Sequence, residues 1–482
     1  MLRHSAVYGI GHMASRGLGF LLLPLHTNVI ATGEYGKAAL IFSFLALMNV
    51  IYGYGMDVAY LRFVAPENDL KKQKVLFSTG LISLLITSVL FTGLLVVFDQ
   101  TFSIIIFRSE TEALLILLSA GILLFDSLTL MPFMALRAKE KSIPFAVLKV
   151  INVVLNIAAN ILFIVVLKKG VAGIFWANLV SSGLTFLFLL PIIFRYFILK
   201  FDTAIFSKLI RFGLPYISSG LAVVAMNIID RPIIERLTDL ETTGIYSAGY
   251  KLGSFMALFI AAFRFAWHPF FLSTSKQANA KAVFARVLTY FMLSCSIVFL
   301  GVSLFVDEIV RFNLFGYSLF GEKYWASTSI IPLILISNIF FGMYVNFYVG
   351  VFLEKKTSII AWVTGISAGV NILLNFLLIP FFGMLGAAWA KVIAYIVLAY
   401  LLYIKSNPLY PIPYEWGRVT KISALALGIF LVQIYFLQWE NIFLKIGLIL
   451  GFFLFLLASG FLDRTEKTRI RKFFKKDHGT TA

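Results

Sequence analysis

The sequence predicts an all-α integral membrane protein of about 14 transmembrane helices, with two six-helix lobes related by pseudo-two-fold symmetry and a C-terminal helix pair. Three observations lead to this fold class: composition, the number of apolar stretches, and an internal repeat. Of 482 residues, 60% are hydrophobic and 13% are charged. Soluble domains average roughly 45–50% and about 25%, so the chain belongs in a bilayer.

Apolar stretches of about 20 residues, the length that spans a bilayer, follow one another with short loops between them. The longest loop on the predicted outer side runs from about Asp307 to Ala326, and no soluble domain is inserted. We therefore expect the function to reside in the membrane region. The predicted helices cover residues 6–30, 37–64, 75–98, 112–136, 144–167, 171–194, 209–234, 244–268, 284–306, 327–352, 358–380, 384–404, 419–438 and 441–462.

The formal net charge of +18 reflects topology more than an affinity for nucleic acid. Of the 41 Lys and Arg residues, 26 fall in segments on one side of the predicted helices and 7 on the other. Cytoplasmic loops carry such an excess of basic residues. The sequence thus predicts a multi-pass membrane protein with both termini in the cytoplasm.

Two blocks of sequence recur at nearly one offset. Residues 32–36 (Thr-Gly-Glu-Tyr-Gly) match 243–247 (Thr-Gly-Ile-Tyr-Ser), 211 positions later. Residues 170–177 match 383–390, 213 positions later, and an Asn-x-x-x-Asn pair precedes each block. Six predicted spans lie in each repeat, so both copies have the same orientation, as in one class of transporter. The predicted divisions are an N-lobe (1–208), a C-lobe (209–405), a linker with the extra helix pair (406–462) and a basic cytoplasmic tail (463–482).

Basic residues inside the predicted spans are the candidate substrate-binding groups. A charge near the bilayer centre costs roughly 2.5–3.5 kcal/mol on insertion scales, so it normally faces protein or a watery cavity. Such cations, spread over the depth of the membrane, suit the passage of an anionic group. For residues near span ends, such as Arg62 and Arg231, extension to lipid headgroups is an alternative. The candidate cavity cations are Arg16, Arg62, Arg231, Lys251, Arg264 and Lys391.

Three acids, Asp57, Asp126 and Asp230, also lie within predicted spans. They are candidates for pairing with the cations, because an unpaired buried charge is costly. Arg16 is the better partner for Asp57, since Arg62 is five residues away on the same helix, which is poor pairing geometry. A second hypothesis makes one of these acids a proton or sodium site for ion coupling.

Enzyme motifs are absent from the sequence. There is no Walker motif, no H-E-x-x-H metal spacing and no arguable Ser-His-Asp set. The single cysteine, Cys295, excludes an intramolecular disulfide. We therefore expect no catalytic residues, no metal and no cofactor.

The pattern resembles the multidrug/oligosaccharidyl-lipid/polysaccharide (MOP) exporter superfamily. The resemblance rests on residues 32–36, on Tyr54-Gly55-Met56-Asp57 with Arg62-Phe63, on Gly170-x-x-Gly173-x-x-Trp176-Ala177, and on the helix from Tyr8-Gly9 to Pro24. Within the superfamily, the chain is most similar to the polysaccharide-export branch, the Wzx-type flippases of lipid-linked oligosaccharides. The resemblance covers essentially the whole chain.

The resemblance implies a central cationic cavity that alternates its access between the two sides of the bacterial cytoplasmic (inner) membrane. The cargo would be an undecaprenyl-diphosphate-linked oligosaccharide, moved to the outer leaflet for surface polysaccharide or O-antigen (lipopolysaccharide) biosynthesis. Membrane lipids and glycan polymerase or assembly proteins would be its partners, and nucleic acid would not. A lipid II-type flippase is the first alternative, a cation-coupled multidrug antiporter the second, and a membrane glycosyltransferase or polymerase the third.

Overall fold

The computed structural model describes residues 17, 20–314, 316–356, 358–437 and 441–461. Within these residues the chain is almost entirely helical, and the only strands form a two-residue-per-strand hairpin, β1 (Asn313–Leu314) with β2 (Tyr317–Ser318). Eleven of the described helical stretches are long and apolar enough to cross a membrane. The predicted all-α membrane fold is confirmed.

The eleven stretches account for twelve of the predicted spans, because one of them contains two. Helix α18 (Ser358–Ser406) is interrupted at Gly383, which has φ 53° and ψ −131°. The last predicted span corresponds to the shorter apolar helix α20 (Ile442–Ala458). Of the first predicted span, the structure describes little more than α2 (Leu22–Val29).

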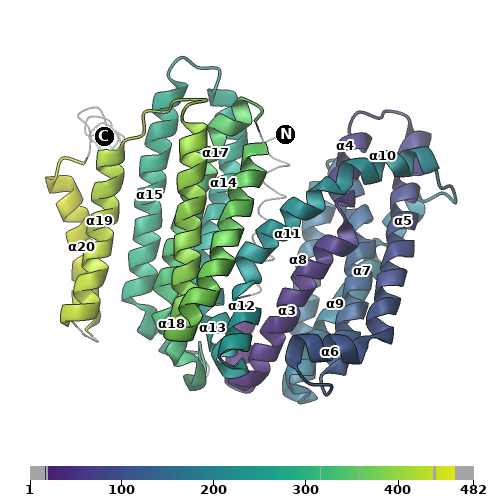
Figure 1. Cartoon of the computed structure of the whole chain (residues 1–482), viewed down its shortest axis with the longest axis horizontal. Coiled ribbons are helices and arrows are strands. Elements are labelled where there is room, and N and C mark those ends of the chain that lie inside the picture. Colours follow the sequence, from purple (N-terminus) through teal and green to yellow (C-terminus); the bar gives the residue numbers. More distant parts are fainter. Residues whose placement is uncertain (1–16, 18–19, 315, 357, 438–440, 462–482) are drawn as a thin grey trace, which may run out of the picture. The chain divides into compact units, whose positions relative to one another are not determined.

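The structure groups the chain into two compact units, of which the larger contains residues 1–273 and 310–410. Figure 1 shows its helices. In addition to α2, α18 and the hairpin, it consists of α3 (Thr32–Gly53), α4 (Met56–Val64), α5 (Leu70–Val97), α6 (Asp99–Phe107), α7 (Ala113–Ala138), α8 (Ser142–Asn160), the π-helix η1 (Ile161–Val166), α9 (Gly170–Tyr196), α10 (Thr203–Gly213), α11 (Pro215–Ile228), α12 (Asp230–Leu237), α13 (Leu240–Gly253), α14 (Phe255–Thr274), the 3-10 helix η2 (Glu322–Ser329) and α17 (Ile331–Leu353).

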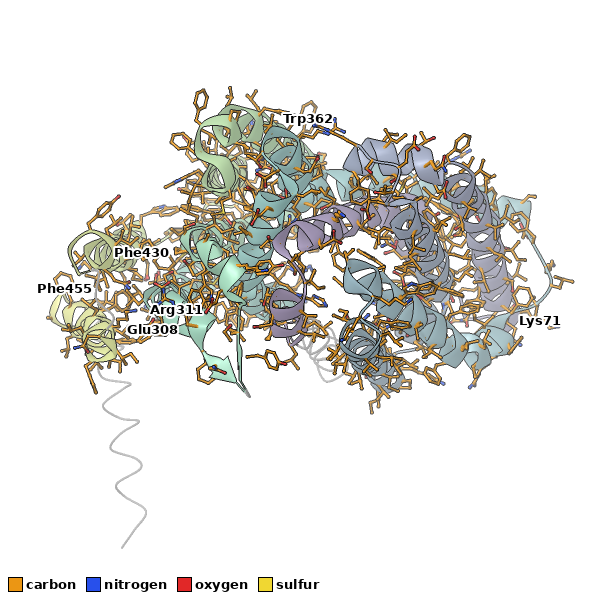
Figure 2. All side chains as sticks on the ribbon, turned by 90° about the horizontal axis from the view of Figure 1, so that it is seen from below. Lys71, Glu308, Arg311, Trp362, Phe430 and Phe455 are labelled. Atoms are coloured by element: carbon orange, nitrogen blue, oxygen red, sulfur yellow. The ribbon has the colours of Figure 1, made fainter. Side chains whose placement is uncertain are left out.

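The smaller unit contains residues 274–309 and 411–482. Its helices are α15 (Ala280–Leu304), the start of α16 (Val306–Arg311), α19 (Trp416–Val432), the π-helix η3 (Gln433–Leu437) and α20. Lys445 of α20 is buried and lies 2.6 Å from Glu308, an ion pair that fixes its position inside the unit. Glu308, Phe430 and Phe455, from three helices of this unit, are labelled in Figure 2. The repeat-based division into lobes, which would place residues 284–306 in the C-lobe, stays a prediction.

Glycine geometry is the same at the two repeated Gly-x-x-Gly turns. Gly170 has φ 56° and Gly383 has φ 53°, a left-handed conformation that favours glycine. Three residues later, a Cβ at Gly173 would press on the end of the preceding helix at Phe163, and one at Gly386 would overlap the Leu378 carbonyl oxygen. Both turns therefore bring a helix back tightly onto its predecessor, which is a structural role for these glycines.

Helices α3 and α13, from the two halves of the sequence, pack closely at their first turns, and Figure 1 shows them together at the lower end of the view. A Cβ on Gly36 would overlap the Leu240 carbonyl oxygen, and one on Gly244 would overlap the Thr32 carbonyl oxygen. The Thr32 hydroxyl also donates to Glu241 at 3.1 Å. This reciprocal contact joins the two halves at the end that the charge distribution assigns to the outer side.

Many large apolar side chains remain exposed along the helices. Trp362, labelled in Figure 2, is 74% exposed, and Leu373 on the same helix is 60% exposed. In water such surfaces would drive association. In a multi-pass membrane protein they face lipid, so the polar groups that remain inside are the ones to examine for function.

Candidate functional site

A cavity of about 410 Å³ lies inside the larger unit, between helices of the first and second halves of the sequence. Its size falls within the roughly 300–1,000 Å³ of typical small-ligand sites. Two polar walls line it. The amide wall comes from the first half, and the lysine wall from the second. The amide wall comprises His26, Asn156, Asn160 and Asn178; the lysine wall comprises Asn227, Tyr250, Lys251 and Ser254. The apolar lining consists of Phe20, Leu22, Phe42, Ile174, Ala257 and Leu258.

Lys251 is the charged member of the cavity lining. It lies in the last turn of α13, which ends at Gly253; the next helix, α14, begins at Phe255. No Asp or Glu is among the lining residues, and no ion pair to Lys251 is found in the described part of the chain. A cation without a carboxylate, in a cavity of low dielectric, attracts an anionic ligand group strongly.

Behind the lysine wall is a buried charged cluster built on Asp230, the first residue of α12. One carboxylate oxygen lies 2.7 Å from the Arg231 guanidinium. The other lies 2.8 Å from Lys391 Nζ and accepts a 2.5 Å hydrogen bond from the Tyr246 hydroxyl. Asp230 and Lys391 side chains are each 1% exposed. Two cations and one carboxylate leave the cluster with a net positive charge.

The helix break between α11 and α12 explains why the cations gather there. Pro232 has no backbone N–H, and the Arg231 N–H bonds to the Asp230 side chain, so the normal helical hydrogen bonds stop. The Asn227 carbonyl oxygen, left without its usual partner, accepts from Arg231 at 2.7 Å and from Lys391 Nζ at 3.0 Å. Sequence local to the break thus creates an acceptor site that the two cations fill.

Tyr250 separates this cluster from the cavity. Its ring lies 4.1 Å from the Arg231 guanidinium and 4.2 Å from Lys391 Nζ. Cation–π contact with both charges holds the ring in place. On the other face of Asn227, the Tyr395 hydroxyl donates to the side-chain oxygen at 3.2 Å. Tyr250 and Asn227 therefore contact the buried cluster on one side and line the cavity on the other.

The amide wall is a connected hydrogen-bond network. Asn160 donates its two amide hydrogens to the backbone carbonyl oxygen and the side-chain oxygen of Asn156. Its own side-chain oxygen must then accept from His26 Nε2 at 2.9 Å, which fixes the tautomer of the ring. His26 Nδ1 is left as a buried acceptor with no partner among the described residues. Asn156 continues the network to the Ser181 hydroxyl at 3.1 Å.

The structure brings three of the six proposed cations, Arg231, Lys251 and Lys391, to the cavity or the cluster behind it. Arg62 and Arg264 are exposed and are absent from the lining. Arg16 lies outside the described residues, and so does any pairing of Arg16 with Asp57. Their roles in substrate binding stay predictions.

The three acids differ in their surroundings. Asp230 is in two ion pairs, whereas Asp126 accepts a hydrogen bond from Ser182 at 2.7 Å, and Asp57 is partly buried. Both oxygens of Asp230 are occupied by side chains of the protein. Ion coupling at any of the three stays a prediction. Among the described residues, no group of three or more His, Cys, Asp and Glu side chains could hold a metal ion.

Sequence reasoning based on charge did not select the neutral members of the site, among them Asn178, Asn227 and Tyr250. The Asn-x-x-x-Asn pair at 156 and 160 was the available signal, because asparagines four apart share one face of a helix. Nothing in the spacing indicated that α9 would add Asn178 to the same wall.

A family model described as "Polysaccharide biosynthesis protein" matches residues 1–275, more than half of the chain. The chain belongs to this family. An uncharacterized membrane protein of Haemophilus influenzae is 24% identical to this chain over 356 residues. The aligned region covers 71% of this chain and 84% of the Haemophilus protein.

Two solved structures extend the comparison to the fold. A lipid II flippase MurJ in an inward closed conformation superposes with a TM-score of 0.76 at 17% identity, covering 94% of this chain and 98% of its own. An inward-facing MATE family multidrug resistance transporter of the MOP superfamily gives 0.64 at 15% identity, covering 85% and 96%. The fold is that of flippases and transporters, and the resemblance to the MOP superfamily is confirmed.

Proposed function

We propose that this protein is a flippase that moves an undecaprenyl-diphosphate-linked oligosaccharide across the inner membrane for surface polysaccharide biosynthesis. The observation that carries the proposal is Lys251, a cation in an acid-free cavity lining between the two halves of a membrane protein of the polysaccharide biosynthesis family. The protein acts as a transporter and not as an enzyme, with both termini in the cytoplasm.

A diphosphate suits the electrostatics of the lysine wall. Phosphate oxygens only accept hydrogen bonds, and Lys251 only donates them. The Asp230 cluster adds a net positive charge behind Tyr250, close enough to raise the potential of the cavity without offering its own cations as ligands. Lys251 therefore serves as the diphosphate contact, and Arg231 and Lys391 act on the ligand through the field of the cluster.

The contact between α3 and α13 supports the proposal of alternating access. With their first turns packed through Gly36 and Gly244, the predicted outer end is closed. Release of cargo on that side requires these turns to separate.

The test compares Lys251→Gln with Lys276→Gln, which removes a lysine from an exposed position outside the cavity. In cells that depend on this protein, Lys251→Gln should reduce surface glycan at least about tenfold, the effect of losing roughly 1.4 kcal/mol of ligand stabilisation. Lipid-linked intermediate should accumulate, while protein level stays unchanged. Normal surface glycan in the Lys251→Gln strain would rule out the diphosphate contact.

A lipid II flippase is the second candidate, and the observation in its favour is the 0.76 TM-score to the MurJ structure over 94% of the chain. Lipid II carries a diphosphate as well, so the lysine wall suits both cargoes. Expression in cells depleted of their own lipid II flippase separates them. Restored growth would favour lipid II, and loss of surface glycan without growth arrest on deletion would favour the oligosaccharide. A multidrug antiporter for cations fits less well, because the cavity lining contains no carboxylate.

A further inference from the structure

The two cavity walls offer opposite hydrogen-bond chemistry. In the lysine wall the charged group is an ammonium that can only donate. In the amide wall, asparagine side chains both donate and accept, and they carry no charge. A ligand that touches both walls should therefore have an anionic part on one side and a neutral part rich in donors and acceptors on the other.

Among the asparagines of the amide wall, Asn178 has the most hydrogen-bonding capacity left for a ligand. One of its amide hydrogens bonds to the Ile174 carbonyl oxygen of its own helix at 2.8 Å. Its second amide hydrogen and its side-chain oxygen have no partner among the described residues, and the side chain lines the cavity. By contrast, Asn160 donates both of its amide hydrogens to Asn156, Asn156 donates one to Ser181, and the side-chain oxygen of each accepts a hydrogen bond.

A second observation points to a missing donor at the same wall. His26 is 3% exposed and lines the cavity, and its Nδ1 atom is an acceptor without a partner among the described residues. A buried acceptor without a partner costs about 1–3 kcal/mol. A diphosphate has no hydrogen to give to Nδ1, whereas hydroxyl and acylamino groups of a sugar do.

The repeat strengthens the contrast between the walls. At the 213-residue offset, the position of Asn178 in the first copy corresponds to Lys391 in the second. Lys391 is bonded to Asp230 and to the Asn227 carbonyl oxygen, and so is withdrawn from ligand contact. At equivalent positions, the first half thus has Asn178, whose amide can still bond a ligand, and the second half has Lys391, whose ammonium is paired with Asp230.

We propose that the amide wall is a carbohydrate subsite, in which Asn178 hydrogen-bonds the first sugar of the lipid-linked glycan while Lys251 holds the diphosphate. The inference rests on the proposed function and adds to it the orientation of the cargo. The glycan lies against α8 and α9, and the diphosphate lies against α13. Discrimination between sugars then resides in the first half of the chain.

The experiment measures binding of two probes to the full-length protein in lipid nanodiscs: undecaprenyl diphosphate, and the same lipid carrying one N-acetylglucosamine. The wild type should bind the sugar-bearing probe about fivefold more tightly, the gain of one to two neutral hydrogen bonds. Asn178→Ala should lose this preference and leave the affinity for the bare diphosphate unchanged. Lys251→Gln should weaken both probes by the same factor.

Asn338→Ala is the matched control. Asn338 is also a partly buried helix asparagine, and its side chain donates a 2.8 Å hydrogen bond to the carbonyl oxygen of Ile334, four residues earlier. It does not line the cavity. It should keep the wild-type preference. Asn178→Ser, which retains a hydroxyl, provides a second variant and should keep part of it.

The outcomes separate the inference from the function on which it rests. Equal binding of both probes by the wild type, or an unchanged preference in Asn178→Ala and Asn178→Ser, would overturn the carbohydrate subsite and leave the flippase proposal standing. Failure of the wild type to bind either probe would overturn the proposed function and the subsite together.

Discussion

Asp230 holds two buried cations at once, so the charged cluster of the second half depends on it. Its carboxylate reaches Arg231 in the neighbouring position and Lys391 in α18, 161 residues away. Removing one partner of a buried ion pair typically costs roughly 3–5 kcal/mol, because the remaining charge is left uncompensated. Here the loss of one carboxylate would expose two cations to that cost.

Asp230→Asn is therefore expected to destabilise the protein by about 3–5 kcal/mol, seen as a lower melting temperature of the purified protein in detergent. Glu110→Gln, at an exposed position, removes one acid with the same change in net charge and should leave the melting temperature unchanged. Equal melting temperatures for the two variants would mean that the cluster contributes no net stability.

The sequence identified the charged residues of the site but not their arrangement. Asp230 and Arg231 stood out because charges inside apolar spans are costly. Their link to Lys391 depends on the approach of α18 to the break between α11 and α12, a tertiary contact that no local pattern encodes. Arg264, chosen by depth alone, is exposed and lies outside the lining, seven residues along α14 from the lining residue Ala257.

At the scale of elements, the repeated sequence blocks that begin at Thr32 and Thr243 identify the two parts that meet at the closed end. The repeat predicted both helices, and the structure adds that each presents a glycine to the carbonyl of the other. The contact pairs Gly36 with Leu240 and Gly244 with Thr32, a reciprocity that comes from packing between the halves and was not visible in the repeat itself.

Gly36→Ala should weaken closure of this end, because the added methyl group overlaps the Leu240 carbonyl oxygen. Gly33→Ala, on the same helix turn with nothing within 4 Å of its Cβ, is the matched control. The reporter is a cavity cysteine, Ser254→Cys, in a Cys295→Ser background. A membrane-impermeant maleimide applied from outside should label it several-fold faster with Gly36→Ala than with Gly33→Ala. Equal rates would show that the glycine contact does not control access.

At the scale of the whole molecule, composition and the number of apolar segments were sufficient to predict the all-α membrane fold. Length and apolar composition identify helices that can cross a bilayer, and eleven of the described stretches meet that criterion. The grouping of α15 with α19 and α20 was not predicted, because lipid-facing helices differ little in composition and their neighbours are set by packing. Orientation is a separate property, which depends on loop charge.

The 26-to-7 distribution of Lys and Arg predicts that the loop containing Lys276 is cytoplasmic and that the loop containing Lys323 is on the outer side. Both lysines are exposed, and Cys295 is fully buried, so single cysteines introduced at either position report accessibility over a low background. In intact spheroplasts, an impermeant maleimide should label Lys323→Cys and spare Lys276→Cys until the membrane is permeabilised. The opposite pattern would invert the topology, and with it the direction of closure assigned to the α3–α13 contact.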